Sequence, residues 1–231
     1  QICDPLAEIS VPMRVRRKIV YTGYLEREGA RGAPNAEHSI PFDRPYLLVT
    51  PGGGGDGEAM VDWVLRAYES DATPPYPALL VFGPFMQQEK QLEFARRVGE
   101  LKNVEAITFE ANIEPLIQGA SGIVAMGGYN TFCEILTFDK PALIIPRTVP
   151  RKEQFIRAYR AQELGLVRML EDDGIRNDRD MATALRHLPQ QHRPSDIIVP
   201  GLLDGLPNVN RLARRLSGRN SRPLAAIAGQ N

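Results

Sequence analysis

The chain has 231 residues, and its 28 basic and 28 acidic side chains leave no formal net charge. Hydrophobic residues make up 43% of the chain, as expected of a globular protein large enough to bury a core, while the even charge gives nucleic-acid binding no support. Two cysteines are too few for a disulfide framework or a cysteine-based zinc site, and no apolar run approaches the ~20 residues of a membrane span.

The first part of the chain has no regular pattern. Residues 1–23 combine a basic run with two X-Pro steps, which disfavour a long helix, so we expect a linker that reaches a short stretch at 19–24. Glycines and charges over residues 26–44 predict a loop.

From Pro45 onward, apolar runs of strand length alternate with segments of helical periodicity. This alternation predicts an α/β fold with a doubly wound parallel sheet of about six strands, covered by helices on both faces. We place this domain at 24–218 and a loose tail at 219–231. The expected strands are 45–50, 78–83, 104–109, 122–126, 141–146 and 166–170, and the expected helices are 58–70, 87–101, 112–120, 130–138, 152–165, 179–188 and 207–218.

Glycine turns follow several of these strands, at the edge where such folds bind ligands. Gly127 and Gly128 lie between a strand and a helix, where free backbone N–H groups can hold a phosphate. The run GGGGDG at 52–57 lacks the Lys-Ser/Thr pair of a P-loop. It either lets a ligand approach the backbone closely or is a flexible connection.

Two interpretations fit the helix that follows Gly128. Thr131 and Glu134 have the T-x-x-E spacing of a capping box, which closes a helix start. Alternatively, the N–H groups of Asn130 and Thr131 bind a pyrophosphate and Glu134 accepts hydrogen bonds from ribose hydroxyls. Both interpretations can hold together.

Charged residues gather after the fifth expected strand. Arg147, Arg151 and Arg157 suit a phosphate, although surface arginines are common. Glu153 and Gln154 begin the next helix, where an acid is favourable in any case and where both could meet sugar hydroxyls. The three histidines show no metal or triad spacing, and no carboxylate pair stands out, so we assign neither a metal site nor a catalytic residue.

With these residues in view, the stretch from Pro45 to Leu170 resembles the C-terminal, donor-binding half of GT-B fold glycosyltransferases, family 28 in particular. That family includes the lipid-linked N-acetylglucosaminyltransferase of peptidoglycan synthesis. The resemblance is carried by FEANIEPLIQGASGIVAMGGYNTFCEILTFDKPALIIPR and EQFIRA. The part beginning GGYNTFCEI also resembles a group of bacterial predicted glycosyltransferases.

The resemblance implies a role for each part of the candidate site. The backbone around Phe109 and Glu110 would recognise the nucleotide base, and Glu134 would bind the ribose. The residues implied for the pyrophosphate are Gly127, Gly128, Asn130 and Thr131, and those implied for the donor sugar and phosphate are Gly53, Gly54, Gly55, Arg147, Arg151, Glu153 and Gln154.

Two departures from the family pattern bear on the reaction. Family 28 usually has two glutamines where Glu153 and Gln154 stand, which leaves the sugar open. Retaining GT-B enzymes often carry an acid eight residues before the ribose glutamate, but Met126 occupies that position here, which favours inversion.

The resemblance therefore implies inverting transfer of a hexosyl or N-acetylhexosaminyl group from a nucleotide-sugar, with a UDP-sugar favoured and no metal or other cofactor. The acceptor stays open, a lipid-linked one included. The catalytic base would come from an N-terminal half, in the same or another chain, of which residues 1–23 would be the end. We expect a cytoplasmic protein, with peripheral attachment at the inner face of the membrane as an option. The alternatives are a nucleotide-sugar epimerase on this fold and a non-catalytic nucleotide-binding module that pairs with a partner subunit.

Overall fold

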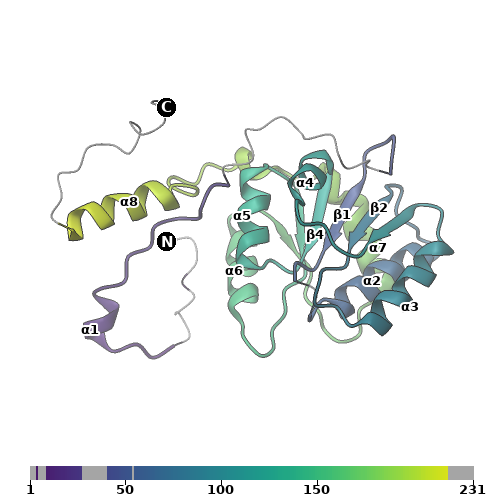
Figure 1. Cartoon of the computed structure of the whole chain (residues 1–231), viewed down its shortest axis with the longest axis horizontal. Helices are drawn as coiled ribbons and strands as arrows, with labels where there is room; N and C mark the ends of the chain where they lie inside the picture. The colour runs from purple at the N-terminus through teal and green to yellow at the C-terminus, as the bar shows by residue number, and fades with distance from the viewer. Residues whose placement is uncertain (1–3, 5–8, 28–40, 54, 218–231) are drawn as a thin grey trace, which may run out of the picture.

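The computed structural model describes residues 4, 9–27, 41–53 and 55–217. At its centre lies a six-stranded sheet in the order β3-β2-β1-β4-β5-β6, in which every pairing is parallel and helices lie on both faces (Figure 1). The predicted doubly wound α/β fold is confirmed. The strands are β1 (Leu47–Thr50), β2 (Ala78–Val81), β3 (Val104–Ile107), β4 (Gly122–Ala125), β5 (Ala142–Ile144) and β6 (Arg168–Met169).

The alternation of side chains along each strand produces two hydrophobic cores. In β1, Leu47 and Val49 face the core that contains α2, α3 and α7, whereas Leu48 faces the core that contains α4, α5 and α6. Because both faces are buried, β1 reads as a continuous apolar run. The helices on the first face are α2 (Glu58–Glu69), α3 (Gln88–Gly99) and α7 (Asp178–His187), and those on the second are α4 (Glu114–Gly119), α5 (Tyr129–Thr137) and α6 (Glu153–Glu163).

The element bounds differ from the sequence-based ones mainly at the ends. The clearest difference is β6, which has two residues where five were expected. It is an edge strand that pairs with β5 alone, through Leu143 with Arg168 and Ile144 with Met169, so few ladder hydrogen bonds extend it. Two 3-10 turns, Leu188–Gln190 and Pro194–Asp196, follow α7.

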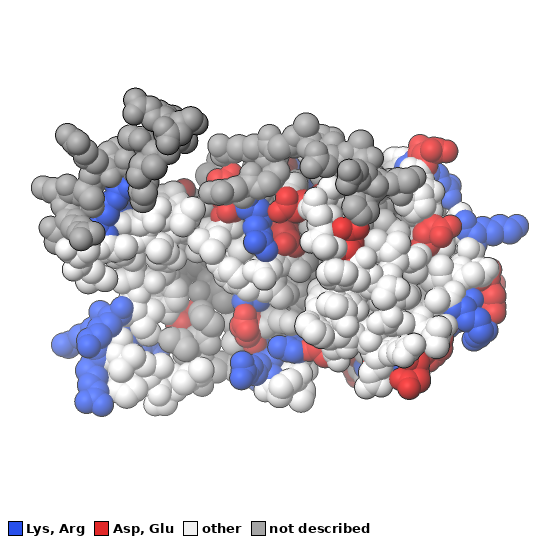
Figure 2. Space-filling model, in the orientation of Figure 1, with Lys and Arg blue, Asp and Glu red and all other residues white. Residues whose placement is uncertain are grey.

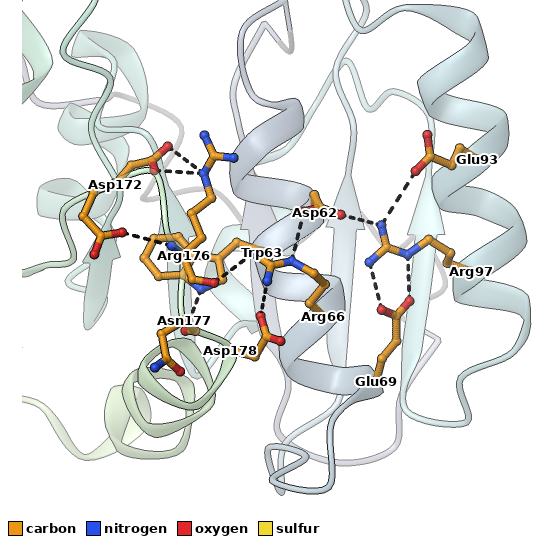
Figure 3. Close-up of polar contacts among 11 residues, drawn as sticks. Asp62, Trp63, Arg66, Glu69, Glu93, Arg97, Asp172, Arg176, Asn177 and Asp178 are labelled. Atoms are coloured by element: carbon orange, nitrogen blue, oxygen red, sulfur yellow. Dashed lines mark hydrogen bonds and ion pairs between the residues drawn. The ribbon is translucent and has the colours of Figure 1, made fainter.

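Ion pairs join the helices on the first face (Figure 3). The Arg97 guanidinium of α3 makes two hydrogen bonds to the Glu69 carboxylate of α2, at 2.7 and 2.9 Å, and a third to Asp62 at 2.7 Å. Trp63 of α2 donates its indole N–H to the Asn177 carbonyl, at the start of α7, at 2.8 Å. These contacts hold α2 against both of its neighbours.

The chain enters and leaves the sheet domain at one place. Tyr24 N donates to Leu202 O at 2.8 Å, and Gly205 N donates back to Tyr24 O at 2.9 Å. From there α1 (Met13–Arg16) and α8 (Gly205–Leu216) lie to one side of the sheet (Figure 1). Basic side chains gather at the end of the molecule where α1 lies, whereas both signs mix over the sheet domain (Figure 2).

Some expectations concern segments at the two ends of the chain. The expected short stretch at 19–24 contains no strand, and the backbone instead forms an isolated antiparallel bridge between Leu25 and Asp204. The predicted tail at 219–231 lies outside the described residues. Within the described ranges, no helix combines the length and the apolar character that crossing a membrane requires.

Candidate functional site

Two glycine turns meet at the point where the strand order reverses, between β1 and β4. Gly52 follows β1 and Gly127 follows β4, both at the carboxyl ends of the strands. A Cβ on Gly52 would lie 3.8 Å from the Thr131 hydroxyl oxygen, so the two turns are neighbours in space. In open α/β sheets, ligands bind beyond the carboxyl ends of the strands at this switch point.

The turn after β4 contains two glycines with different roles: Gly127 adopts a left-handed backbone, and Gly128 leaves the space beside it open. Gly127 has φ 77°, and a Cβ there would lie 2.8 Å from the Ile144 Cγ2 atom. Gly128 has φ −54° and caps the N-terminus of α5, but a Cβ there would meet nothing within 4 Å. The backbone of Gly128 therefore borders open space.

The start of α5 presents backbone N–H groups toward that space. Phe132 N donates to Gly128 O at 2.9 Å, and helix geometry leaves the N–H groups before it without a helical acceptor. No described side chain caps this helix. Free N–H groups and the positive end of the helix dipole together favour an anion.

The capping-box interpretation of α5 is wrong. The left-handed turn at Gly127 lets the helix begin at Tyr129, so Gly128 is the N-cap and Thr131 already lies within the first turn. Glu134 is thus in the second turn, where it cannot reach back to the N-cap. Its carboxylate is available for another partner.

That partner is Arg27, from the segment before the sheet domain. Its guanidinium donates to Glu134 Oε1 at 3.0 Å, and its backbone N–H donates to Thr137 Oγ1 at 3.2 Å. Burial raises the pKa of the Glu134 carboxyl, and the positive charge of Arg27 opposes that rise. The sequence analysis missed Arg27, because it lies 107 residues from Glu134 in a stretch without periodicity.

The loop after β5 contacts the turn after β1. Arg147 forms an ion pair with Asp56 of the GGGGDG run, and its backbone N–H donates to Gln154 Oε1 at 3.2 Å. Arg151, in the same loop, is exposed. Asp56 lies inside the GGGGDG run, but nothing in the sequence indicates that it pairs with Arg147.

Arg157 of α6 links Glu153, at the start of that helix, to the turn after β4. Glu153 forms an ion pair with Arg157, and Arg157 donates to the Gly127 carbonyl at 2.7 Å. Of the expected donor-sugar residues, Glu153 is thus linked through Arg157 to the turn after β4, and Gln154 is linked to the backbone of Arg147.

The remaining expected residues lie on the loops after β1 and β3. Phe109 is 55% exposed, and Glu110 Oε1 accepts from the Asn112 backbone N–H at 2.7 Å. Gly53 and Gly55 are exposed beside the Phe85 side chain. Gly54 lies outside the described residues.

The chemistry of this arrangement is that of an anion and polyol site. Backbone N–H groups and two arginines can meet a diphosphate, and carboxylates can accept from hydroxyls. Over the part of the chain that is described, no three His, Cys, Asp or Glu side chains are grouped to hold a metal. That no metal is needed, and that the base lies elsewhere, stay predictions.

The architecture is that of the GT-B glycosyltransferases. The chain is similar to the calicheamicin glycosyltransferase CalG4, with a TM-score of 0.58 and 20% identity over 94% of this chain and 50% of that one. It is also similar to the glycotransferase of kitacinnamycin, with a TM-score of 0.56 and 16% identity over 93% and 49%.

Residues 47–192 match the model of the glycosyltransferase family 28 C-terminal domain, and the chain belongs to that family. It is 31% identical over 157 residues to an uncharacterized glycosyltransferase of Methanosarcina acetivorans, covering 68% of this chain and 38% of that one. It is 26% identical over 160 residues to a UDP-N-acetylglucosamine–N-acetylmuramyl-(pentapeptide) pyrophosphoryl-undecaprenol N-acetylglucosamine transferase of Bacillus cereus, covering 66% and 43%. The chain thus spans less than half the length of these two relatives.

Proposed function

We propose that this chain is the donor-binding half of an inverting glycosyltransferase, and that it holds a nucleotide-sugar, with a UDP-sugar favoured, in the crevice between β1 and β4. One observation carries the proposal. The start of α5 has no side-chain cap and opens onto free space at Gly128, and Glu134 lies six residues after Gly128, in the second turn of the same helix. In a nucleotide-sugar the diphosphate lies next to the ribose, so the helix start and Glu134 can each contact one of these two groups.

Each part of the donor then has a partner. The diphosphate lies on the N–H groups from Gly128 to Thr131, with Arg147 and Arg151 toward it. The ribose hydroxyls donate to Glu134, the base lies along the loop of Phe109 and Glu110, and the sugar meets Glu153 and Gln154. As the bond to the sugar breaks, negative charge grows on the departing diphosphate, where the dipole of α5 stabilises it.

Inversion is supported by the residue eight places before Glu134. Met126 stands there, 5% exposed, and its thioether cannot act as the acid that retaining relatives carry. Attack then needs a base on the acceptor side. We place that base in an acceptor-binding half, in the same or another chain.

The acceptor and the location are further parts of the proposal. The Bacillus cereus relative carries a pyrophosphoryl-undecaprenol substrate in its name, and its likeness supports a lipid-linked acceptor here. On this proposal the enzyme works in the cytoplasm, at the inner face of a membrane.

Isothermal titration calorimetry of the 231-residue chain with UDP, GDP and dTDP tests the donor site. We expect binding, tightest for UDP. We also expect Glu134→Gln to weaken it, because a neutral amide accepts less strongly from hydroxyls than a carboxylate does. Glu163→Gln, on the exposed face of α6, is the matched control and should bind as the wild type does. A chain that binds none of the three nucleotides would rule the proposal out.

A further inference from the structure

Arg157 is the one charged side chain that is buried among the residues the structure describes. It is 4% exposed, and Thr50 is the other polar residue in that class. A buried charge costs several kcal/mol, on the order of the whole stability of a domain, unless it is paired and hydrogen-bonded. The location of this charge therefore calls for a reason.

The contacts of Arg157 lead to three parts of the candidate site. One nitrogen of its guanidinium donates to the Gly127 carbonyl at 2.7 Å, and the other is paired with Glu153. The guanidinium carbon lies 5.7 Å from the centre of the Tyr129 ring. The turn after β4, the start of α5 and the start of α6 thus share one side chain.

The bond to Gly127 also fixes the direction of the next N–H group. In a trans peptide, the carbonyl oxygen and the following N–H point to opposite sides. Arg157 draws the Gly127 oxygen into the domain, so the Gly128 N–H is turned outward. A Cβ on Gly128 would also meet nothing within 4 Å, so this residue borders open space.

We propose that Arg157 is a positioning residue that holds the phosphate turn and Glu153 in one arrangement, so that diphosphate and donor sugar bind as a coupled pair. This inference rests on the proposed function. The planar guanidinium is suited to the task because its N–H groups form a rigid fork with two fixed directions. A lysine keeps the charge, but its three N–H donors share one rotatable nitrogen and so do not fix the carbonyl and the carboxylate in two set directions.

The test compares Arg157→Lys and Arg157→Met with Arg160→Lys. Arg160 lies three residues further along α6, where it pairs with Glu163 at 2.8 Å on the exposed face. Calorimetry measures the affinity of each chain for three probes. These are inorganic pyrophosphate, the nucleoside diphosphate that the wild type binds best of UDP, GDP and dTDP, and its nucleoside.

We expect Arg157→Lys to lose about tenfold in affinity for both diphosphates and to keep its nucleoside affinity within about twofold, since the base and ribose contacts lie elsewhere. Arg157→Met should lose at least as much, and Arg160→Lys should match the wild type. Equal losses for all three probes would indicate a merely structural role and overturn the inference, as would unchanged diphosphate binding.

A second measurement needs no variant. Amide hydrogen exchange of the wild type with and without pyrophosphate should show protection at 127–131 and also at 153–157. Protection of the first segment alone would overturn the coupling while leaving the proposed function standing. A wild type that binds no nucleoside diphosphate contradicts both.

Discussion

The Arg27 guanidinium donates to the Glu134 carboxylate at 3.0 Å, across 107 residues of chain. This ion pair connects the segment before the sheet domain to the residue that we assign to the ribose. Arg27 lies outside the glycine turns but affects the charge of Glu134, a candidate ligand-binding group. This effect can be measured from the pH dependence of nucleotide binding.

Replacing Arg27 with Gln should raise the pH below which nucleotide binding is lost. Burial raises the pKa of Glu134 above its usual 4.5, and Arg27 opposes this. Without the guanidinium the pKa rises further, so the carboxylate is protonated, and ceases to accept from ribose, at a higher pH. Calorimetry with UDP over the pH range above the usual carboxyl value of 4.5 gives the profile. Identical profiles for wild type and Arg27→Gln would contradict the assignment.

The raised pKa of Glu134 also makes the free energy of unfolding depend on pH. A carboxyl with a raised pKa in the folded state stabilises the fold fully below its unfolded value of 4.5, and this contribution is lost as the pH rises through the folded value. Glu134→Gln removes the titrating group. Its free energy of unfolding should therefore lack this decline, which urea titrations across that pH range would detect.

Two neighbouring glycines should respond differently to the same substitution. Gly127→Ala places a Cβ 2.8 Å from Ile144 in a left-handed backbone, so we expect a loss of about 1–3 kcal/mol in the free energy of unfolding from strain alone. Gly128→Ala has a permitted backbone and open space, and should cost about 1 kcal/mol or less as a changed N-cap.

Ligand binding separates these variants further. In Gly128→Ala the new methyl group enters the space that we assign to the diphosphate, so UDP should bind more weakly although the fold persists. Urea denaturation and calorimetry on both variants provide the comparison. If Gly128→Ala binds UDP as tightly as the wild type does, the diphosphate does not bind at this turn.

The network on the opposite face of the sheet offers a stability test that is independent of the ligand. Arg97 is 12% exposed and contacts Asp62 and Glu69, whereas its neighbour Arg96 pairs with Glu100 on the exposed surface. We expect Arg97→Met to lower the free energy of unfolding by about 2 kcal/mol and Arg96→Met by less than about 0.5 kcal/mol. Similar losses from both would show that the network adds nothing.

The contribution of Asp62 to the stability of the fold should also be lost at low pH. Burial raises its pKa, but hydrogen bonds and charges from Arg97 and Arg66 outweigh burial and leave the pKa below the usual 3.8. Its stabilising effect is therefore present above pH 3.8 and is lost as the pH falls through the folded value. The difference in the free energy of unfolding between the wild type and Arg97→Met, measured in urea titrations, should therefore become smaller below that pH.

The sequence predicted the layers of this fold but missed the contacts between distant segments. The helices of the sheet domain follow from local periodicity. The strands β1, β2, β4 and β5 follow from continuous apolar runs, because all of their residues are buried. The start of α5 was expected at residue 130 and lies at Tyr129, and T-x-x-E suggested an N-cap at Thr131 where the structure has Gly128. Only the bend at Gly127 shows where the helix begins. Nothing local indicates that Arg27 contacts Glu134 or that Arg157 contacts Gly127, because such pairs form only when the strands assemble.

The loop after β3 provides the last prediction, which concerns base recognition. Glu110 Oε1 accepts from the Asn112 N–H at 2.7 Å and so closes a short turn beside Phe109. Glu110→Ala removes this acceptor and should weaken UDP binding, while pyrophosphate, which has no base, should bind as before. Glu110→Gln keeps an oxygen at the same place and is the matched control. Because the two probes differ in the nucleoside, an equal loss for both would mean that Glu110 acts on the phosphate turn, and no loss for either would place the base away from this loop.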